Sequence, residues 1–297
     1  MANPIQSIAV LGAGTMGQGI AYASCLAGYR TKLFDIEPAM LQKAKDYMSS
    51  AFQKAVSKTS LSQEEANKSF ARLETTTDFS LAVSNADFLI EAAPEKMDLK
   101  LDIFRRADAI APAHAIFATN TSSLSITEMA GVTKRAAQVI GMHFFNPVPV
   151  MKLIEIIRGL ETSEATIHAT QAVAEAMKKE SVLINESPGF ITTRINAMIG
   201  NEAFYMLQEG VAGAGEIDKA LRLGLNHPMG PFELVDLVGL DTRLHILNFL
   251  HSALGEKFRP CPLMVKYVKA ERLGRKVGKG VYEYDKDGKR IETAAKF

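Results

Sequence analysis

The sequence has few of the features that mark membrane, secreted or metal-dependent proteins. It contains no tryptophan and only two cysteines, Cys25 and Cys261, which lie in unrelated contexts without the spacing of a zinc site. Because a disulfide framework has no support, we expect a reducing compartment and no bound metal. No apolar run approaches membrane-spanning length, and Met1 to Gln6 leave no room for a signal peptide. The sequence therefore predicts a cytoplasmic protein.

An excess of charge of either sign is also absent. The 34 Lys and Arg residues nearly balance 33 Asp and Glu residues, which gives a net charge of +1 at pH 7. This balance gives no reason to expect nucleic acid or a membrane surface as partner, so any anion must be bound by a local cluster. An apolar fraction of 47% indicates a globular protein, and 297 residues suit two domains.

A glycine-rich turn follows the first apolar strand. The strand ends at Leu11, residues 12–17 read Gly-Ala-Gly-Thr-Met-Gly, and helix-forming residues continue to Leu26. Strand, G-x-G-x-x-G and helix in this order are typical of dinucleotide binding. Gly12 permits the tight turn, Gly14 lets a pyrophosphate approach the backbone, and Gly17 lets the helix pack against the strand. The alternative is a glycine-rich turn that binds no nucleotide.

An acidic residue ends the second strand. Residues 31–34 are a short apolar strand, and Asp35 follows it about twenty residues beyond the glycines. A carboxylate in this place accepts both ribose hydroxyls of the adenosine half and repels a 2′-phosphate. We therefore expect the cofactor NAD rather than NADP.

Strands and helices then alternate along the chain. We expect further strands at 73–76, 87–91, 115–119, 138–143 and 181–185, with helices at 38–58, 62–72, 96–110, 125–130 and 163–180. This alternation predicts an α/β fold with a doubly wound, mostly parallel sheet. In such sheets ligands bind outside the carboxyl ends of the strands. The segments 91–95, 120–123 and 143–146, which include Ser122 and Asn146, are therefore expected to meet at the edge that carries the glycine loop.

Ser122 is expected to form hydrogen bonds to a substrate. A hydroxyl near a histidine could also indicate a Ser-His nucleophile, but the sequence around Ser122 lacks a nucleophile elbow. The structural alternative for Ser122 and Ser123 is that they cap the helix that follows them.

His143 and Glu155 are the candidate pair for acid-base chemistry. His143 ends one strand, Pro147 and Pro149 bound a turn, and Glu155 is the only charged residue within the apolar segment 153–157. A lone charge in such a strand costs several kcal/mol unless it is paired. If the turn places the two strands side by side, Glu155 can hold one imidazole nitrogen while the other takes a proton. The alternative is a core glutamate paired with an unrelated cation.

Two basic segments could bind phosphate groups of a ligand. Lys43, Lys54 and Lys58 share one face of the helix expected at 38–58, and residues 275–284 form a basic, glycine-rich stretch. The lysine face could bind a second phosphate-bearing ligand or could be a solvated surface. The basic stretch could reach back to phosphate or could be a mobile loop.

The alternation of strands and helices stops at Pro188-Gly189. We place the domain boundary there, with an NAD-binding domain at 1–187 and an all-helical domain at 188–297. The second domain has more apolar residues than one small helical unit needs. We therefore expect it to contribute to substrate binding and to form a homodimer.

Six segments together resemble the short, two-domain L-3-hydroxyacyl-CoA dehydrogenases, in particular the bacterial 3-hydroxybutyryl-CoA dehydrogenases. The resemblance spans nearly the whole chain. The residues that carry it are Gly12-Ala13-Gly14-Thr15-Met16-Gly17, Glu91-Ala92-Ala93-Pro94-Glu95, Asn120-Thr121-Ser122-Ser123-Leu124, Gly141-Met142-His143-Phe144-Phe145-Asn146-Pro147, Pro188-Gly189-Phe190, and Gly224 with His227-Pro228-Met229-Gly230-Pro231.

The resemblance implies NAD-dependent interconversion of a 3-hydroxyacyl-CoA and a 3-oxoacyl-CoA, in fatty acid or butanoate metabolism. His143 would take the 3-hydroxyl proton, and Glu155 would stabilise the imidazolium. Ser122 would contact both substrate and cofactor, and Thr193 would donate its hydroxyl to the substrate where many members have asparagine. The further residues implied are the NAD contacts Met16, Glu95, Lys100, Asn146 and Lys276, and the CoA contact Lys58 with its neighbour Lys54.

Two other functions are compatible with the same fold. A dehydrogenase of a free hydroxy acid would rely on a lysine where this chain has His143 and Glu155, and it would not need the lysine face. A non-catalytic NAD-binding protein would have no use for a base. The acyl chain length and the physiological direction are left open by these residues.

Overall fold

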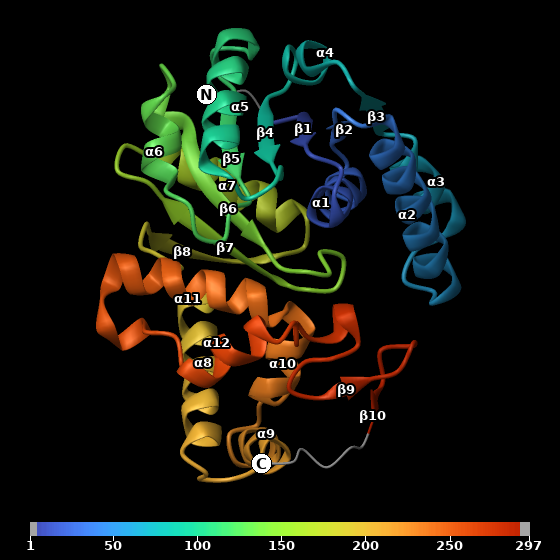
Figure 1. The fold of residues 1–297 in the computed structure, drawn as a ribbon. Coiled ribbons are helices and arrows are strands. Elements are labelled where there is room, and N and C mark those ends of the chain that lie inside the picture. The colour runs from blue at the N-terminus through green and yellow to red at the C-terminus, as the bar shows by residue number, and fades with distance from the viewer. Residues whose placement is uncertain (1–4, 292–297) are drawn as a thin grey trace. The chain divides into compact units, whose positions relative to one another are not determined.

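The computed structural model describes residues 5–291, and the chain divides into two compact units, 1–187 and 188–297 (Figure 1). Residues 1–4, on which part of the signal-peptide expectation rests, lie outside the described range. Within that range no helix is long and apolar enough to cross a membrane.

The first unit holds one sheet and its flanking helices. Its strands are β1 (Ser7–Leu11), β2 (Arg30–Phe34), β3 (Leu73–Thr76), β4 (Phe88–Glu91), β5 (Ile116–Thr119), β6 (Val139–Phe144), β7 (Leu153–Arg158) and β8 (Glu180–Asn185). Its helices are α1 (Thr15–Leu26), α2 (Pro38–Ser57), α3 (Gln63–Phe70), α4 (Phe79–Val83), α5 (Met97–Ile110), α6 (Ile126–Gly131) and α7 (Glu164–Ala176), with a 3-10 turn η1 (Ala136–Gln138).

The sheet confirms the predicted fold class. Its strand order is β3-β2-β1-β4-β5-β6-β7-β8, and every neighbouring pair is parallel except β6 and β7. The order reverses between β1 and β4, which places the switch point of the doubly wound sheet at the carboxyl end of β1. The glycine loop begins there.

Helices cover both faces of this sheet (Figure 1). One continuous core joins α1, α2, α3 and α7 to one face through buried residues such as Ile20, Met48 and Val173. On the other face, Phe104 of α5 meets Phe117 of β5 edge to face, with ring centroids 5.8 Å apart. Because both faces are covered, the central strands are apolar throughout.

Local sequence signals account for most element ends in this unit. Ser62 and Glu65 form the predicted capping box of α3. The short helix α4 was not predicted, although Asp78 caps its first turn by accepting a hydrogen bond from the Leu81 N–H. Helix α7 ends four residues earlier than predicted, because Lys178 adopts a φ of +57° in the turn that leads into β8.

The second unit is helical, but it is not all-helical as predicted. Its elements are α8 (Thr192–Gln208), α9 (Ala214–Gly224), α10 (Pro231–Val238), α11 (Leu240–Leu254), η2 (Glu256–Phe258), α12 (Pro262–Lys269), η3 (Arg275–Val277) and an antiparallel hairpin of β9 (Glu283–Tyr284) and β10 (Arg290–Ile291). From the sequence one helix is expected at 232–254, but the structure has two there, α10 and α11, because Gly239 adopts a φ of +104° between them.

Two buried aspartates hold the basic stretch 275–284 in place. Asp236 accepts hydrogen bonds from the Val281 and Tyr282 N–H groups and the Tyr284 hydroxyl, at 2.8, 2.9 and 2.9 Å. Asp218 accepts one from the Tyr282 hydroxyl at 2.7 Å. Burial raises the pKa of both carboxyl groups, although these donors oppose that rise. The stretch is therefore an anchored part of the second unit rather than a mobile loop.

Candidate active site

The glycine loop has the geometry that a pyrophosphate site requires. Gly12 adopts a φ of +107°, and a Cβ on it would lie 2.7 Å from the Ala92 carbonyl oxygen. A Cβ on Gly17 would lie 1.7 Å from the Gly12 carbonyl oxygen, so α1 packs against the turn that precedes it. A Cβ on Gly14 would meet nothing within 4 Å. Packing of the turn and of α1 thus requires glycine at positions 12 and 17. At Gly14 the space that a Cβ would occupy is open, so a ligand can approach the backbone there.

The amino end of α1 begins directly behind this opening. Gly14 is its N-cap residue, no side chain caps the helix, and no acidic residue lies in its first turn. The first N–H groups of a helix lack partners within the helix and attract anions. The residues present therefore fit the diphosphate of a dinucleotide.

Asp35 lies against the same loop. Its Oδ2 accepts a hydrogen bond from the Ala13 N–H at 2.7 Å, and its Oδ1 accepts one from the Glu37 N–H at 3.0 Å. Two backbone donors thus fix the carboxylate at the end of β2, beside the glycine turn. This is the place at which a carboxylate can accept the ribose hydroxyls of NAD.

His143 and Glu155 meet across the antiparallel pair β6 and β7, as their spacing predicted. The two residues are directly opposite in the strand register, and His143 Nδ1 lies 2.7 Å from Glu155 Oε2. Glu155 is fully buried, and the His143 side chain is 10% exposed. Because Nδ1 faces the carboxylate, that nitrogen carries a proton and the reactive nitrogen of the ring is Nε2.

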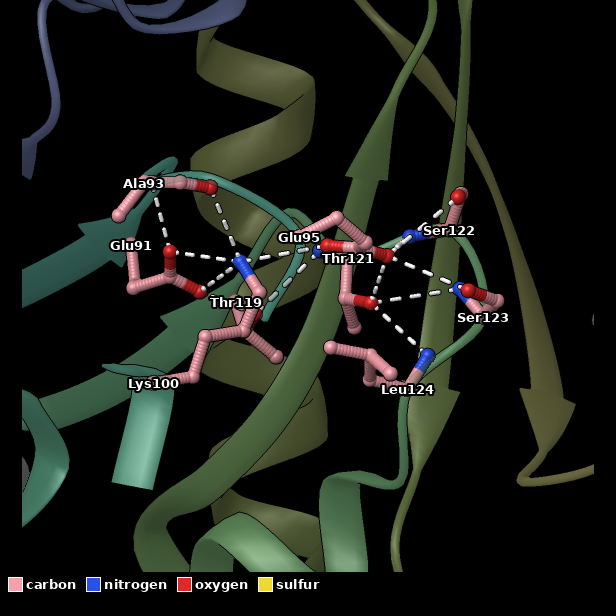
Figure 2. A network of polar contacts seen from close by, with 9 residues as sticks. All are labelled: Glu91, Ala93, Glu95, Lys100, Thr119, Thr121, Ser122, Ser123 and Leu124. Carbon is pink, nitrogen blue, oxygen red and sulfur yellow. Dashed lines mark hydrogen bonds and ion pairs between the residues drawn. The ribbon is translucent and has the colours of Figure 1, made fainter. Parts of the chain in front are cut away.

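A polar network joins the segments that follow β4 and β5 (Figure 2). Glu95, after β4, accepts hydrogen bonds on Oε1 from the Thr121 hydroxyl and from the Ser122 N–H, the latter at 3.0 Å. The hydroxyls of Ser122 and Ser123 lie 3.5 and 3.3 Å from the same oxygen. The structure therefore brings Glu95 and Ser122 together, as expected for two residues at one edge of the sheet.

The capping alternative for Ser122 and Ser123 is wrong. Helix α6 begins at Ile126, and its N-cap is Ser125, whose hydroxyl accepts a hydrogen bond from the Glu128 N–H at 3.1 Å. The two preceding serines lie in the connection from β5, where the Glu95 carboxylate holds them.

The next connection along this edge is also held in place. The Asn120 side-chain oxygen accepts a hydrogen bond at 2.9 Å from the N–H of Phe144, the residue after His143. Asn146 follows and is exposed, and the peptide bond between it and Pro147 is cis. Hydrogen bonds thus link the segment after β4 to the segment after β5, and the segment after β5 to the end of β6, around the expected site.

The residues predicted to contact CoA lie at the end of α2. Lys54 is exposed in its last turn, and Lys58 is the exposed C-cap residue. Within residues 5–291, neither lysine nor Lys43 forms an ion pair, so their ammonium groups are not neutralised by the part of the chain that the structure describes. Their role in CoA binding stays a prediction.

Two predicted site residues belong to the second unit. Thr193 lies in the first turn of α8, and Lys276 lies in η3 with its Nζ 2.6 Å from both Asp241 carboxylate oxygens. This ion pair is about half exposed. The parts of Thr193 and Lys276 in substrate and NAD binding stay predictions.

The sequence placed the segments 91–95 and 120–123 at this edge, but it gave no individual role to Glu91, Thr119, Asn120 or Thr121. Glu91 is fully buried and pairs with Lys100, whose side chain is 1% exposed, with a shortest distance of 2.7 Å. A signal was present, because Glu91 ends the apolar run Phe88-Leu89-Ile90 and a lone charge there requires a partner. The Lys100 ammonium group lies inside the protein, and the contact with NAD expected for Lys100 stays a prediction.

The glycine loop, Asp35 and the carboxylate-held histidine, all at the carboxyl edge of one doubly wound sheet, define a dinucleotide-dependent oxidoreductase. The 3-hydroxyacyl-CoA dehydrogenase NAD-binding domain matches residues 7–187, and the C-terminal domain of the same family matches residues 189–284. The chain therefore belongs to the 3-hydroxyacyl-CoA dehydrogenase family, and its cofactor is NAD.

Relatives with names in this family match the chain over nearly its full length. A probable 3-hydroxybutyryl-CoA dehydrogenase from Bacillus subtilis is 46% identical over 95% of this chain and 98% of that protein. A 3-hydroxybutyryl-CoA dehydrogenase from Bradyrhizobium diazoefficiens is 41% identical over 96% of this chain and 97% of that protein. The crystal structure of (S)-3-hydroxybutyryl-CoA dehydrogenase from Ralstonia eutropha superimposes with a TM-score of 0.92 at 43% identity, covering 95% of this chain and all of the other.

Proposed function

We propose that this protein interconverts (S)-3-hydroxybutyryl-CoA and acetoacetyl-CoA with NAD as hydride acceptor. The observation that carries the proposal is the buried His143–Glu155 pair, 2.7 Å apart, at the sheet edge that also holds the glycine loop. The names of the relatives in Bacillus subtilis, Bradyrhizobium diazoefficiens and Ralstonia eutropha support the substrate.

His143 acts as the general base in the oxidation. Its Nε2 takes the proton of the 3-hydroxyl group, and the electron pair of that O–H bond forms the C=O bond while the electron pair of the C3–H bond leaves carbon 3 with the hydrogen as hydride. Bound NAD supplies the hydride acceptor. Glu155 keeps the imidazole in the tautomer that presents Nε2 and stabilises the imidazolium that forms. In the reduction, the imidazolium returns the same proton to the 3-oxo oxygen.

Side chains outside this pair bind the two nucleotide-bearing ligands. Gly14 and the amino end of α1 hold the NAD diphosphate, and Asp35 holds the adenosine ribose. Lys54 and Lys58 attract the CoA phosphates as exposed ammonium groups. Ser122 donates its hydroxyl to the substrate, and Thr193 in the second unit supplies a further hydroxyl.

The assembly and the compartment are also proposals. We propose a homodimer through the second unit, supported by exposed apolar side chains there, including Ile195 at 56% and Leu223 at 78% exposure. We propose the cytoplasm as the compartment, supported by two buried free thiols, Cys25 and Cys261. Analytical ultracentrifugation tests the dimer, and fractionation of the producing cells tests the compartment.

The first experiment measures absorbance at the NADH band while the purified protein consumes NADH with acetoacetyl-CoA. Free acetoacetate and NADPH serve as parallel controls. Rapid loss with NADH and the CoA ester alone establishes the reaction class, the thioester requirement and the coenzyme choice. Rapid loss with free acetoacetate would instead establish the alternative dehydrogenase of a free hydroxy acid.

The role of His143 is tested by His143→Ala. Because the glycine loop and Asp35 are untouched, NADH should bind with the wild-type Kd, while kcat should fall by at least ~10³-fold through loss of the base and its imidazolium. If the protein were a non-catalytic NAD-binding protein, the wild type would show no turnover and His143→Ala would have no activity to remove. A His143→Ala protein that kept most of its activity would refute the mechanism.

A further inference from the structure

Strand β6 extends beyond its neighbour β5 at the active-site edge. The last pair in the parallel ladder between these strands joins Thr119 of β5 to Gly141 of β6. Strand β6 then continues to Phe144, so His143 lies two residues past that pair. The backbone ladder with β5 therefore ends before it reaches the proposed base.

On its other side the end of β6 is held by β7. The antiparallel ladder pairs His143 with Glu155 and Phe144 with Ile154. In such a ladder each strand uses the N–H and C=O groups of one side only. The groups on the opposite side of the strand end are buried with the sheet edge and need other partners.

The Asn120 side chain supplies one of these partners. Its Oδ1 accepts a hydrogen bond from the Phe144 N–H at 2.9 Å. Because the N–H group is a donor, the amide oxygen must face it, which fixes the orientation of the side chain. The Asn120 N–H donates in turn to the carbonyl oxygen of Glu91, the last residue of β4, at 2.8 Å. Asn120 therefore joins the ends of β4 and β6 across the end of β5.

The Phe144 backbone links the proposed base to the core. Phe144 is 2% exposed and belongs to the core of the first unit. Its two neighbours in the chain, His143 and Phe145, place their rings in contact, with centroids 4.6 Å apart. A shift of the Phe144 backbone would therefore carry both rings with it, and Asn120 opposes that shift.

We propose that Asn120 is a positioning residue, which acts through the Phe144 N–H to keep the His143 ring where the reaction requires it. Its side-chain oxygen takes the place of the backbone acceptor that a longer β5 would provide. The proposal rests on the proposed function of His143 as the general base. It assigns to the acceptor oxygen of Asn120 an effect on kcat.

Two variants at this position separate the acceptor oxygen from the rest of the side chain. Asn120→Ala removes the oxygen and leaves the Phe144 N–H without its partner. Asn120→Asp keeps an oxygen at the same number of bonds from the backbone, and it replaces the amide NH2 group by a second oxygen. Asp should therefore restore the function if the acceptor matters, and it should fail like Ala if the NH2 group matters.

Gln138 provides the matched control at the amino end of the same two strands. It directly precedes β6, and its Nε2 donates to the carbonyl oxygens of Ala113 and Ala115, just before β5, at 2.9 and 3.2 Å. Gln138→Ala thus also removes a side-chain amide that ties β6 to the chain around β5. It does so at the end of the strands that lies away from His143.

Two spectroscopic readouts test the contact whether or not the protein turns over the proposed substrate. Relative to the Ile140 amide in the same strand, hydrogen exchange of the Phe144 amide should be at least ~10-fold faster in Asn120→Ala. In Asn120→Asp and Gln138→Ala this ratio should stay within about threefold of wild type. The nitrogen chemical shift of His143 Nδ1, which reports on its hydrogen bond to Glu155, should change in Asn120→Ala and not in Gln138→Ala.

These readouts keep the proposal apart from the proposed function. If the wild type failed to oxidise NADH with acetoacetyl-CoA, the proposed function would fall, while the exchange ratio and the His143 shift would still report whether Asn120 holds the ring. Wild-type values of both in Asn120→Ala would overturn the proposal.

Kinetics then measure the effect on turnover. In Asn120→Ala, kcat for acetoacetyl-CoA should fall by roughly 10-fold to 100-fold, because a displacement of about 1 Å costs that much, while KM should change by less than about threefold. Asn120→Asp, measured at its own optimal pH, and Gln138→Ala should stay within about fivefold of the wild-type kcat. Equal losses of kcat in Asn120→Asp and Asn120→Ala would overturn the proposal, as would a higher Kd for NADH in Asn120→Ala with an unchanged kcat. If Asn120→Ala did not fold, Asn120→Ser would take its place, because its hydroxyl oxygen lies one bond closer to the backbone.

Discussion

The glycine loop allows the fold and cofactor binding to be perturbed separately. At Gly14 an added methyl group would meet nothing within 4 Å, and the φ of −67° suits an L-residue. Gly14→Ala reduces the conformational freedom of the unfolded chain, which stabilises by about 0.4–1 kcal/mol. It also weakens the N-cap of α1, which costs a similar amount. We therefore expect a Tm within about 3 °C of wild type.

The same methyl group should weaken NADH binding. It would occupy the open side of the backbone where the diphosphate must approach, and loss of one charge-assisted hydrogen bond costs about 1.5–3 kcal/mol. The Kd for NADH should therefore rise by about 10-fold to 150-fold. Because the protein contains no tryptophan, NADH fluorescence can be titrated without indole emission.

Three further glycines complete this test. Gly131→Ala is the matched control, since a Cβ there also meets nothing within 4 Å, and it should bind NADH normally. Gly17→Ala and Gly12→Ala should lose stability by at least about 1–3 kcal/mol, because their methyl groups would lie 1.7 and 2.7 Å from backbone oxygens. A Gly14→Ala protein with wild-type NADH affinity would refute the assignment of the diphosphate to this loop.

Three other predictions follow from single contacts. Asp35→Ser removes the carboxylate beside the ribose and should reduce the ratio of kcat/KM for NADH over NADPH by at least tenfold, measured with one substrate; an unchanged ratio would contradict its role. At Asp87, burial alone would raise the carboxyl pKa, but hydrogen bonds from the His114 ring and from Gln6 and Ser7 lower it from 3.8 to about 2. The hydrogen bonds to the Asp87 carboxylate therefore stabilise the fold above pH 3.8, and this contribution is lost as the pH falls toward 2. In urea unfolding, Asp87→Asn should lower the free energy of unfolding by about 1 kcal/mol at pH 7, after a discount for solvent screening, and by less at pH 3. Tyr284→Phe removes a hydrogen-bond donor to buried Asp236 and should lower the free energy of unfolding by about 1–3 kcal/mol in the same assay. Tyr205→Phe is the control and should have little effect, because the Tyr205 hydroxyl makes a 3.4 Å contact near the surface.

The sequence predicted the sheet and the pairing of His143 with Glu155 because both follow from local rules. Alternation of apolar strands and helices specifies a doubly wound sheet, and a turn bounded by Pro147 and Pro149 returns the chain antiparallel to itself. Glu155 then faces His143 because the two residues are directly opposite each other in the register of the antiparallel pair. The hairpin of β9 and β10 has no such pattern, since each strand is only two residues long.

The segments 91–95 and 120–123 were expected to meet, but the individual hydrogen bonds of the network around Glu95 could not be predicted, for a different reason. Its partners come from the ends of β4 and β5 and from α5, and the separation between Glu95 and Ser122 along the chain is 27 residues. Nothing in the local pattern distinguishes a lysine whose ammonium group turns inward, such as Lys100, from one that stays in solvent. The only sequence signal was Glu91, a carboxylate at the end of an apolar strand that requires a cation.

That difference bears on how a residue's role is transferred from a motif to a new chain. The motif that contains Glu95 and Lys100 suggested that both contact NAD. The structure gives them different surroundings: the Glu95 side chain is 37% exposed, and the Lys100 side chain is 1% exposed and paired with Glu91. The NAD contacts of Glu95 and Lys100 therefore stay predictions, and each calls for its own measurement of NADH affinity because the two side chains differ in exposure.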